Sequence, residues 1–168
     1  MPVEQLTPEH EFWPALVEHL LRVDMARWVI DTNAHPLPAA YFLGAFAGAE
    51  IIGHISIRTQ IVTVPKTDWS AGYNHRLTDA FSKPLTETFV QTFAVEEAYR
   101  RQGYGRALQL AALQLTRTLG AYQLRSWSSL DKSENYMLKI SLGFAAYPAI
   151  FVTEDGKQIS GVYFVQVV

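Results

Sequence analysis

The sequence predicts an α+β (mixed α/β) fold in which helices cover both faces of a sheet. Two observations lead to this class. Apolar residues recur at helical spacing in some segments and alternate with polar residues, as in strands, in others. The segments also follow a mixed order: helical segments first, then mainly antiparallel strands, then a β-α-β-α-β-β succession. The length of 168 residues fits one domain over residues 1–168.

The first half of the chain is expected to supply four strands and two helices. The strands are short and bounded by turn residues, and they cover 3–6, 40–47, 51–64 and 87–95. The helices cover 13–21 and 24–30. Pro14 conflicts with a helix already under way, so the first helix is expected to start late or to kink. Alternation of polar and apolar residues over 54–61 predicts a strand with one drier face. The long connection at 65–86 is of a length that is often functional.

The second half is expected to supply two helices and three further strands. The helices cover 104–119 and 131–142, and the strands cover 122–128, 146–152 and 161–168. Gly120 is expected to end the first of these helices. Asp131, with Glu134 three residues later, resembles a capping box at the start of the second.

Composition excludes several classes of function. The chain has no cysteine, so disulfides and thiolate metal sites are excluded. A net charge of -2 offers no overall basic field for nucleic acid. None of the five histidines has a partner at metal-ligand spacing, so we expect no metal. No apolar run reaches the roughly 18 residues that span a bilayer, and no signal-peptide pattern is present. We therefore expect a cytoplasmic protein with no membrane partner.

The most informative stretch is "RRQGYGRALQ" at residues 100–109, between a predicted strand and a predicted helix. Helix N-termini present unpaired N–H groups and a partial positive charge, and glycine lets a ligand approach that backbone closely. The dinucleotide fingerprint is not matched, because Leu108 stands where its third glycine belongs. No lysine follows Gly105, so the P-loop is not matched either. From these residues alone, an anion cradle and a plain strand-to-helix turn both remain open.

Two longer stretches extend the signal. "TFVQTFAVEEAYRRQGYGRALQ" resembles the central acyl-coenzyme A motif of the GNAT superfamily of N-acetyltransferases, and "DKSENYMLKISLGF" resembles its later motif. The order of elements over nearly all of the chain is similar too. The resemblance implies a GNAT-like, mostly antiparallel twisted sheet of about seven strands, in which two strands splay apart. It implies acetyl-coenzyme A, or another acyl-coenzyme A, as co-substrate, and a small-molecule or peptide amine as acceptor.

The resemblance also implies which residues bind the coenzyme. The amides of Gln102 to Arg106 would hold the pyrophosphate, and the backbone of Phe93 to Val95 would pair with the pantetheine arm. The full set expected to bind the coenzyme is Phe93, Ala94, Val95, Arg100, Arg101, Gln102, Gly103, Tyr104, Gly105, Arg106 and Asn135. For Asn135 a solvated polar face is an equally simple explanation. A coenzyme-binding sensor or partner subunit without chemistry is the alternative function, and homodimer formation is left open.

For catalysis we expect direct attack of the amine on the thioester. Glu87, acting through a water chain, is the first choice of base, and His54 is the second. The position where relatives often carry a glutamate is Phe89 here. The place of the tyrosine that commonly protonates the thiolate is held by Lys139, which we expect to be exposed. Tyr136, one turn earlier, is expected to substitute as acid, although a packing role is equally open.

Two features bear on the acceptor. Residues 1–95 carry ten acidic and six basic side chains, a net of -4, whereas residues 96–168 carry six acidic and eight basic, a net of +2. Because the first part forms much of the acceptor side in this fold, we expect a cationic or neutral amine. Trp69 and Tyr73, in the long connection, are the aromatic candidates to line an acceptor pocket.

Overall fold

The computed structural model describes residues 2–31, 33–37, 39–62, 77–152 and 156–168. Its strands form a seven-stranded sheet in the order β1-β2-β3-β4-β5-β7-β6. The pair β4/β5 is parallel and all other neighbours are antiparallel. The strands are β1 Val3–Leu6, β2 Ala40–Ala47, β3 Glu50–Ile61, β4 Thr86–Val95, β5 Gln123–Ser129, β6 Ala145–Val152 and β7 Gln158–Val167. The predicted fold class is confirmed.

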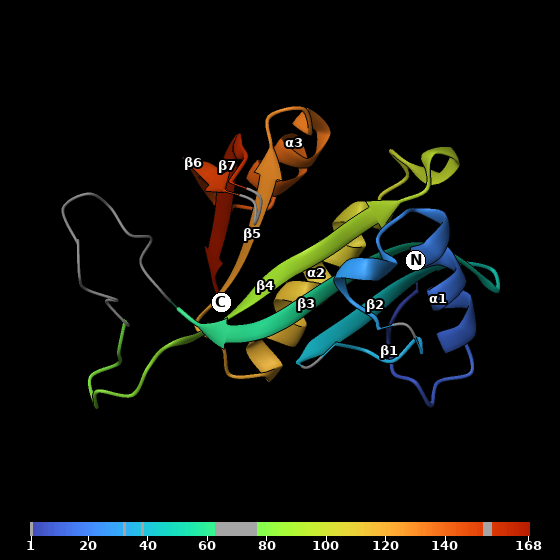
Figure 1. Cartoon of the computed structure of the whole chain (residues 1–168), viewed down its shortest axis with the longest axis horizontal. Helices are drawn as coiled ribbons and strands as arrows, with labels where there is room; N and C mark the ends of the chain where they lie inside the picture. Colours follow the sequence, from blue (N-terminus) through green and yellow to red (C-terminus); the bar gives the residue numbers. More distant parts are fainter. Residues whose placement is uncertain (1, 32, 38, 63–76, 153–155) are drawn as a thin grey trace.

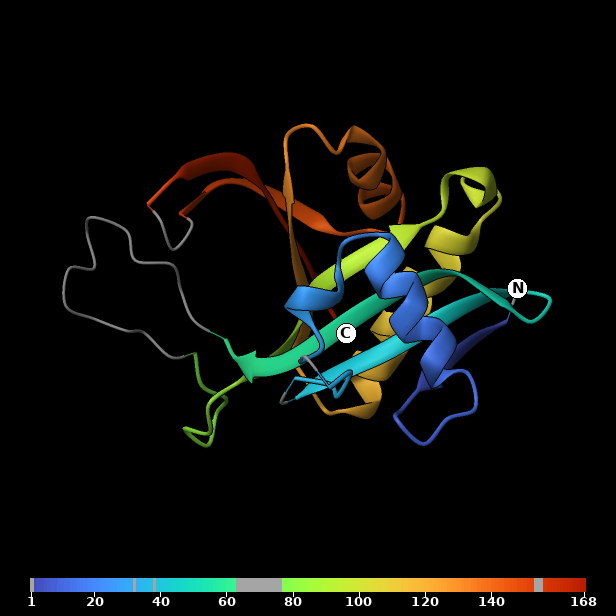
Figure 2. The ribbon, with the colours of Figure 1, turned by 45° about the vertical axis from the view of Figure 1, so that its right-hand side comes forward.

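The helices cover both faces of the sheet, with α1 on one face and α2 on the other (Figures 1 and 2). They are α1 Trp13–Arg22, α2 Tyr104–Thr118 and α3 Ser133–Ser141. The late start expected for the first helix is confirmed, since α1 begins at Trp13 with Pro14 in its first turn. None of the helices in the described part of the chain is both long and apolar enough to cross a bilayer.

Two local expectations were wrong. The helix expected over 24–30 is only a 3-10 segment, η1, at Ala26–Trp28. The capping box at the start of α3 does not form, because the N-cap residue is Lys132 and no side chain caps it. The Asp131 carboxylate instead accepts a hydrogen bond from the Ser129 hydroxyl.

Each face of the sheet has its own apolar core. Under α1 and η1, the buried side chains include Leu16, Leu20, Val29, Phe42 and Phe46. Under α2, they include Ile55, Ile57, Leu108, Leu113, Leu124 and Phe164. The core under α1 also contains polar groups, since the side chains of His54 and Ser56 on β3 are fully buried. The expectation of one drier face on this strand was therefore too simple, because in this segment both faces are covered.

The central strand β4 departs from regular pairing on both of its edges. Toward β3, Ser56 pairs with Thr92 and Ile57 with Val90, so Gln91 is the extra residue of a β-bulge. Toward β5, pairing is confined to three residues that end at Phe89. Figure 1 shows β5 turning away from β4 beyond this point. The two parallel strands thus separate inside the sheet.

Candidate active site

A cleft of about 850 Å³ lies where β4 and β5 separate. Its walls are β4 from residue 90 to 95, β5 from 126 to 129, the first turn of α2, and one side of α3. Three buried side-chain atoms of the lining have no hydrogen-bond partner among the described residues: Gln91 Oε1, Ser126 Oγ and Asn135 Oδ1. Buried polar groups are normally satisfied, so these atoms suit the cleft to a polar ligand.

The first turn of α2 opens onto this cleft without a cap. Gly103 is the N-cap residue, in the left-handed region at φ 93°, and it has no side chain to cap the helix. The amides of Tyr104, Gly105 and Arg106 have no intrahelical partner by helix geometry. A Cβ atom on Gly105 would lie 3.3 Å from Phe93 Cζ. Glycine therefore lets α2 pack closely on β4, and Gly103, Gly105 and Arg106 of this turn line the cleft.

Basic side chains surround the same turn. Arg100, Arg101 and Arg106 all line the cleft and are exposed. Arg100 Nε donates to the Val95 carbonyl at 3.0 Å, which folds its guanidinium back over the end of β4. Arg106 Nη1 lies 3.4 Å from Ser141 Oγ on α3. The sequence-predicted cradle residues are therefore brought together in one place.

Two residues of the predicted set point elsewhere. The amide nitrogen of the Gln102 side chain donates to the Ala98 carbonyl at 3.0 Å, so it braces the loop. The Tyr104 ring packs edge-on against Tyr99, with centroids 6.2 Å apart. For both, only the backbone remains available to the cleft.

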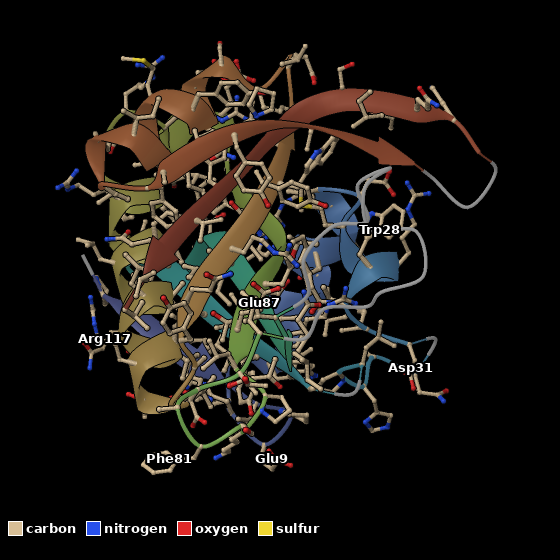
Figure 3. All side chains as sticks on the ribbon, turned by 90° about the vertical axis from the view of Figure 1, so that its left-hand side faces the viewer. Glu9, Trp28, Asp31, Phe81, Glu87 and Arg117 are labelled. Atoms are coloured by element: carbon tan, nitrogen blue, oxygen red, sulfur yellow. The ribbon has the colours of Figure 1, made fainter. Side chains whose placement is uncertain are left out.

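Glu87 lies away from the cleft, in a buried ion pair. Its carboxylate is fully buried and accepts bonds from Gln60 Nε2 and Gln123 Nε2 at 2.7 Å and from Arg125 Nη2 at 2.5 Å. Figure 3 shows Glu87 within the molecule and Arg117 at its outer edge. With both oxygens held by three donors, Glu87 is poorly placed to take a proton from a substrate.

On α3, Tyr136 packs against the apolar core, whereas Lys139 lies in the wall of the cleft. The Tyr136 hydroxyl donates to the Ser129 carbonyl at 3.0 Å, and its ring packs on Phe164. The expectation that Lys139 is exposed was wrong, since its side chain is fully buried and lines the cleft. Its Nζ donates to Gln109 Oε1 at 3.0 Å, and burial lowers the pKa of this amine to about 7. Helical periodicity missed this because the partner of Lys139 is Gln109 on α2, 30 positions away in the sequence.

His54 belongs to a buried polar chain that sequence reasoning missed. Its Nε2 lies 3.0 Å from Thr92 Oγ1, and its Nδ1 lies 3.0 Å from His19 Nε2. His19 Nδ1 in turn lies 3.1 Å from Glu96 Oε1. Burial lowers the pKa of His54 to about 3, and the nearby His19 adds to this. The available signal was His19 itself, since it lies between Leu16 and Leu20 on the apolar face of α1.

The remaining sequence-based candidates concern the acceptor pocket and a metal site. Trp69 and Tyr73 lie outside the described residues. Within the described ranges, no group of three or more metal-ligating side chains comes together.

Comparison with known proteins settles the family. A family model described as the acetyltransferase (GNAT) family matches residues 6–144. The chain belongs to this family. The predicted enzyme class, an acyl-coenzyme A-dependent N-acyltransferase, and acetyl-coenzyme A as its co-substrate are thereby confirmed at the level of the family.

Solved structures share the fold at low sequence identity. Arabidopsis thaliana NAA60 in complex with acetyl-CoA is 14% identical with a TM-score of 0.67, and the match covers 99% of this chain and 98% of that one. The ribosomal-protein-S18-alanine N-acetyltransferase from Escherichia coli is 17% identical with a TM-score of 0.61, over 99% and 94% of the two chains. An aminoglycoside 6'-N-acetyltransferase complexed with coenzyme A is 12% identical with a TM-score of 0.62, over 99% and 97%.

Proposed function

We propose that this GNAT protein moves an acetyl group from acetyl-coenzyme A to a primary amine by direct attack within a ternary complex. The observation that carries the proposal is the cleft between the separated strands β4 and β5, which the uncapped first turn of α2 lines. Direct attack is favoured because the chain has no cysteine to carry the acyl group covalently.

The pyrophosphate of the coenzyme binds at the start of α2 in this proposal. The amides of Gln102 to Arg106 donate to the phosphate oxygens, and the helix dipole favours their negative charge. Arg101 and Arg106 supply charge at the rim, while Arg100 fixes the loop through its bond to Val95. Tyr104 contributes only its amide.

The pantetheine arm lies along the free edge of β4. Phe93, Ala94 and Val95 pair with β3 on one side, whereas their pairing with β5 has already ended. A pantetheine amide added to this edge extends the sheet by main-chain hydrogen bonds, and an N–H of this edge polarises the thioester carbonyl. The unpaired Asn135 Oδ1 accepts a hydrogen bond from the same arm.

The amine must lose protons to react. An amine with a pKa near 10.4 is almost wholly protonated at neutral pH, at a cost of about 4–5 kcal/mol. We assign the first step of proton removal to the Thr92 hydroxyl, because Thr92 lines the cleft and its hydroxyl lies 3.0 Å from His54 Nε2. We assign no dedicated acid, because the Tyr136 hydroxyl is held by backbone carbonyls and a thiol pKa near 8.5 makes the thiolate a tolerable leaving group.

The acceptor is proposed only as a class. The names of the similar structures include an alanine of a ribosomal protein and an aminoglycoside, so this fold serves both peptide and small-molecule amines. The net -4 of residues 1–95 favours a neutral or cationic acceptor over an anionic one.

Free-thiol release tests the proposal. Purified protein is incubated with acetyl-coenzyme A and a panel of cationic, neutral and anionic primary amines, and the thiol is measured with time. We expect release above the amine-free rate for at least one neutral or cationic amine. Tight binding of acetyl-coenzyme A without release for any amine would favour the non-catalytic coenzyme-binding alternative. No binding at all would contradict both functions.

A further inference from the structure

A continuous chain of hydrogen bonds runs from the cleft to the protein surface beneath α1. It consists of Thr92, His54, His19 and Glu96, with successive separations of 3.0, 3.0 and 3.1 Å. The first three side chains are almost fully buried, whereas the Glu96 side chain is 22% exposed. Thr92 lines the cleft. This Thr92–Glu96 chain therefore connects the reaction space with water through the interior.

Each bond of the chain can have only one direction. Arg22 binds the Glu96 carboxylate, and although burial opposes ionisation, the bonds from Arg22 and His19 lower the pKa of Glu96 overall. An ionised carboxylate only accepts, so His19 Nδ1 donates to it. Burial lowers the pKa of His19 and of His54, so each ring is neutral and has one N–H. His19 Nε2 must then accept from His54 Nδ1, and His54 Nε2 must accept from the Thr92 hydroxyl.

The cleft end of the chain is also determined. Ser56 Oγ accepts the Thr92 amide at 3.1 Å, so its hydroxyl proton is free to donate to Thr92 Oγ1 at 2.6 Å. Thr92 Oγ1 thus donates once and accepts once. Its second lone pair has no partner among the residues described, and Thr92 is 5% exposed at the cleft wall. An amine in the cleft can donate to this lone pair.

We propose that the Thr92–Glu96 chain carries the proton lost by the attacking amine out of the cleft to Glu96. The proposal rests on the proposed function. Thr92 is a catalytic residue in this scheme, because its hydroxyl contacts the amine. His54 and His19 are positioning residues, since they act through it, and Glu96 exchanges the proton with water.

The transfer balances in protons and bonds. The amine binds neutral, having left its first proton in water. As its nitrogen–carbon bond forms, its second proton passes to Thr92 Oγ1, the hydroxyl proton passes to His54, and one proton moves along each ring to Glu96. The carbon–sulfur bond then breaks. A proton returning from water by the same path restores both rings and reaches the thiolate, so the products are the amide and the free thiol.

The free protein gives a test that needs no substrate. The ¹⁵N shifts of the imidazole nitrogens report which nitrogen is protonated. At pH 7 we expect His19 and His54 both neutral, with the proton on Nδ1. Either ring charged, or protonated on Nε2, would contradict the direction of the chain and overturn the proposal.

Kinetics test the role of the chain in turnover. Thr92→Val removes the hydroxyl at the cleft, and Glu96→Gln removes the acceptor at the surface. Thr88→Val is the matched control, because Thr88 is a buried threonine on the same strand whose hydroxyl bonds to Thr116 at 2.6 Å. Both chain variants are expected to lose about tenfold or more in kcat with little change in KM for acetyl-coenzyme A. The control is expected to keep both values.

The possible kinetic results distinguish a failure of the proton path from a failure of the proposed acetyltransferase function. An unchanged kcat in Glu96→Gln, or an equal loss in Thr88→Val, would overturn the proton path while leaving the acetyltransferase intact. Because Glu96 is at the surface, its variant keeps the test decisive even where Thr92→Val fails to fold. A wild-type protein that releases no thiol with any amine would instead remove the proposed function, and with it the catalytic role of the chain.

Discussion

Arg125, the last residue of β5 that pairs with β4, donates a hydrogen bond to Glu87 of β4 inside the sheet. Glu87 is fully buried and Arg125 is 9% exposed. Gln60 and Gln123 occupy the remaining positions around the carboxylate. The ion pair therefore stabilises the junction between β4 and β5 below the cleft. Each of its two charges is neutralised by the other.

Glu87→Gln is expected to destabilise the fold. The change leaves the Arg125 guanidinium buried without its counter-charge, which typically costs about 3–5 kcal/mol. Urea denaturation measures the loss, and Glu97→Gln is the control because Glu97 is exposed. Unchanged stability together with a shifted acid limb of the pH–rate profile would favour Glu87 as the base after all.

Acetyl-coenzyme A is expected to raise the Tm of the wild-type protein, because a ligand that binds only the native state stabilises it by mass action. In Gly105→Leu this rise should vanish, since the added side chain meets Phe93 and Leu138 and fills the approach to the α2 amides. Thermal melts with and without ligand check this. An equal rise in both proteins would show that the coenzyme binds elsewhere.

Arg106→Ala is expected to weaken acetyl-coenzyme A binding about tenfold, as for the loss of one charge-assisted contact to phosphate. Arg117→Ala is the matched control, since it removes the same charge from the other end of α2, where the side chain is exposed at the edge of the molecule (Figure 3). Calorimetric titration gives both Kd values. Equal losses would mean that only overall charge matters.

Stability is expected to fall with acid because of His54. Its pKa is about 3 in the folded protein, below the ordinary value of 6.5, so between these values the unfolded chain binds a proton that the folded one does not. The free energy of unfolding should drop by about 1.4 kcal/mol per pH unit as the pH falls through this window. His54→Gln should flatten the dependence, whereas a change at the exposed His35 should not. A dependence that His54→Gln leaves as steep would contradict the assignment.

Lys139 is expected to cost stability at neutral pH. Its pKa is about 7 in the folded protein against 10.5 ordinarily, so the unfolded chain binds more protons between these values and stability falls as the pH drops from 10.5 to 7. Lys139→Met should therefore raise Tm at pH 7, and the gain should shrink toward pH 10. Lys132→Met, at an exposed position, is the control. A lower Tm at pH 7 would mean that the bond to Gln109 outweighs the burial of the amine.

The sequence predicted those features that depend on residues close together along the chain. The strand-to-helix turn at Gly103 and Gly105 was predicted because its glycines, its arginines and the following apolar helix lie within ten residues. The periodicity of α1 and α2 was visible for the same reason. Element bounds failed mainly at η1, which is shorter than the expected helix, and at the start of α3, where the expected capping box does not form.

Contacts between segments that are distant in the sequence could not be predicted. Glu87 and Arg125 are 38 positions apart, and His19 and His54 are 35 apart, so no local pattern marks either pair. The bulge at Gln91 depends on how β4 pairs with β3, which strand propensity does not specify. Glu87 was suggested as the base because it lies two residues before Phe89, the position where relatives often carry a glutamate. In the fold, Glu87 instead pairs with Arg125, and His54 is connected to the cleft through Thr92.

The narrow junction between β4 and β5 has a consequence for how the protein unfolds. Three residue pairs join the part of the sheet formed by β1 to β4 to the part formed by β5, β7 and β6. The helix α2 packs on strands of both parts, so side-chain contacts beneath it, more than main-chain bonds, must hold the two parts together as one cooperative unit. A coenzyme bound along the open edge would add main-chain bonds at this seam. Amide exchange would then slow across the whole sheet on binding, with the strands beyond the seam gaining protection although they never touch the ligand.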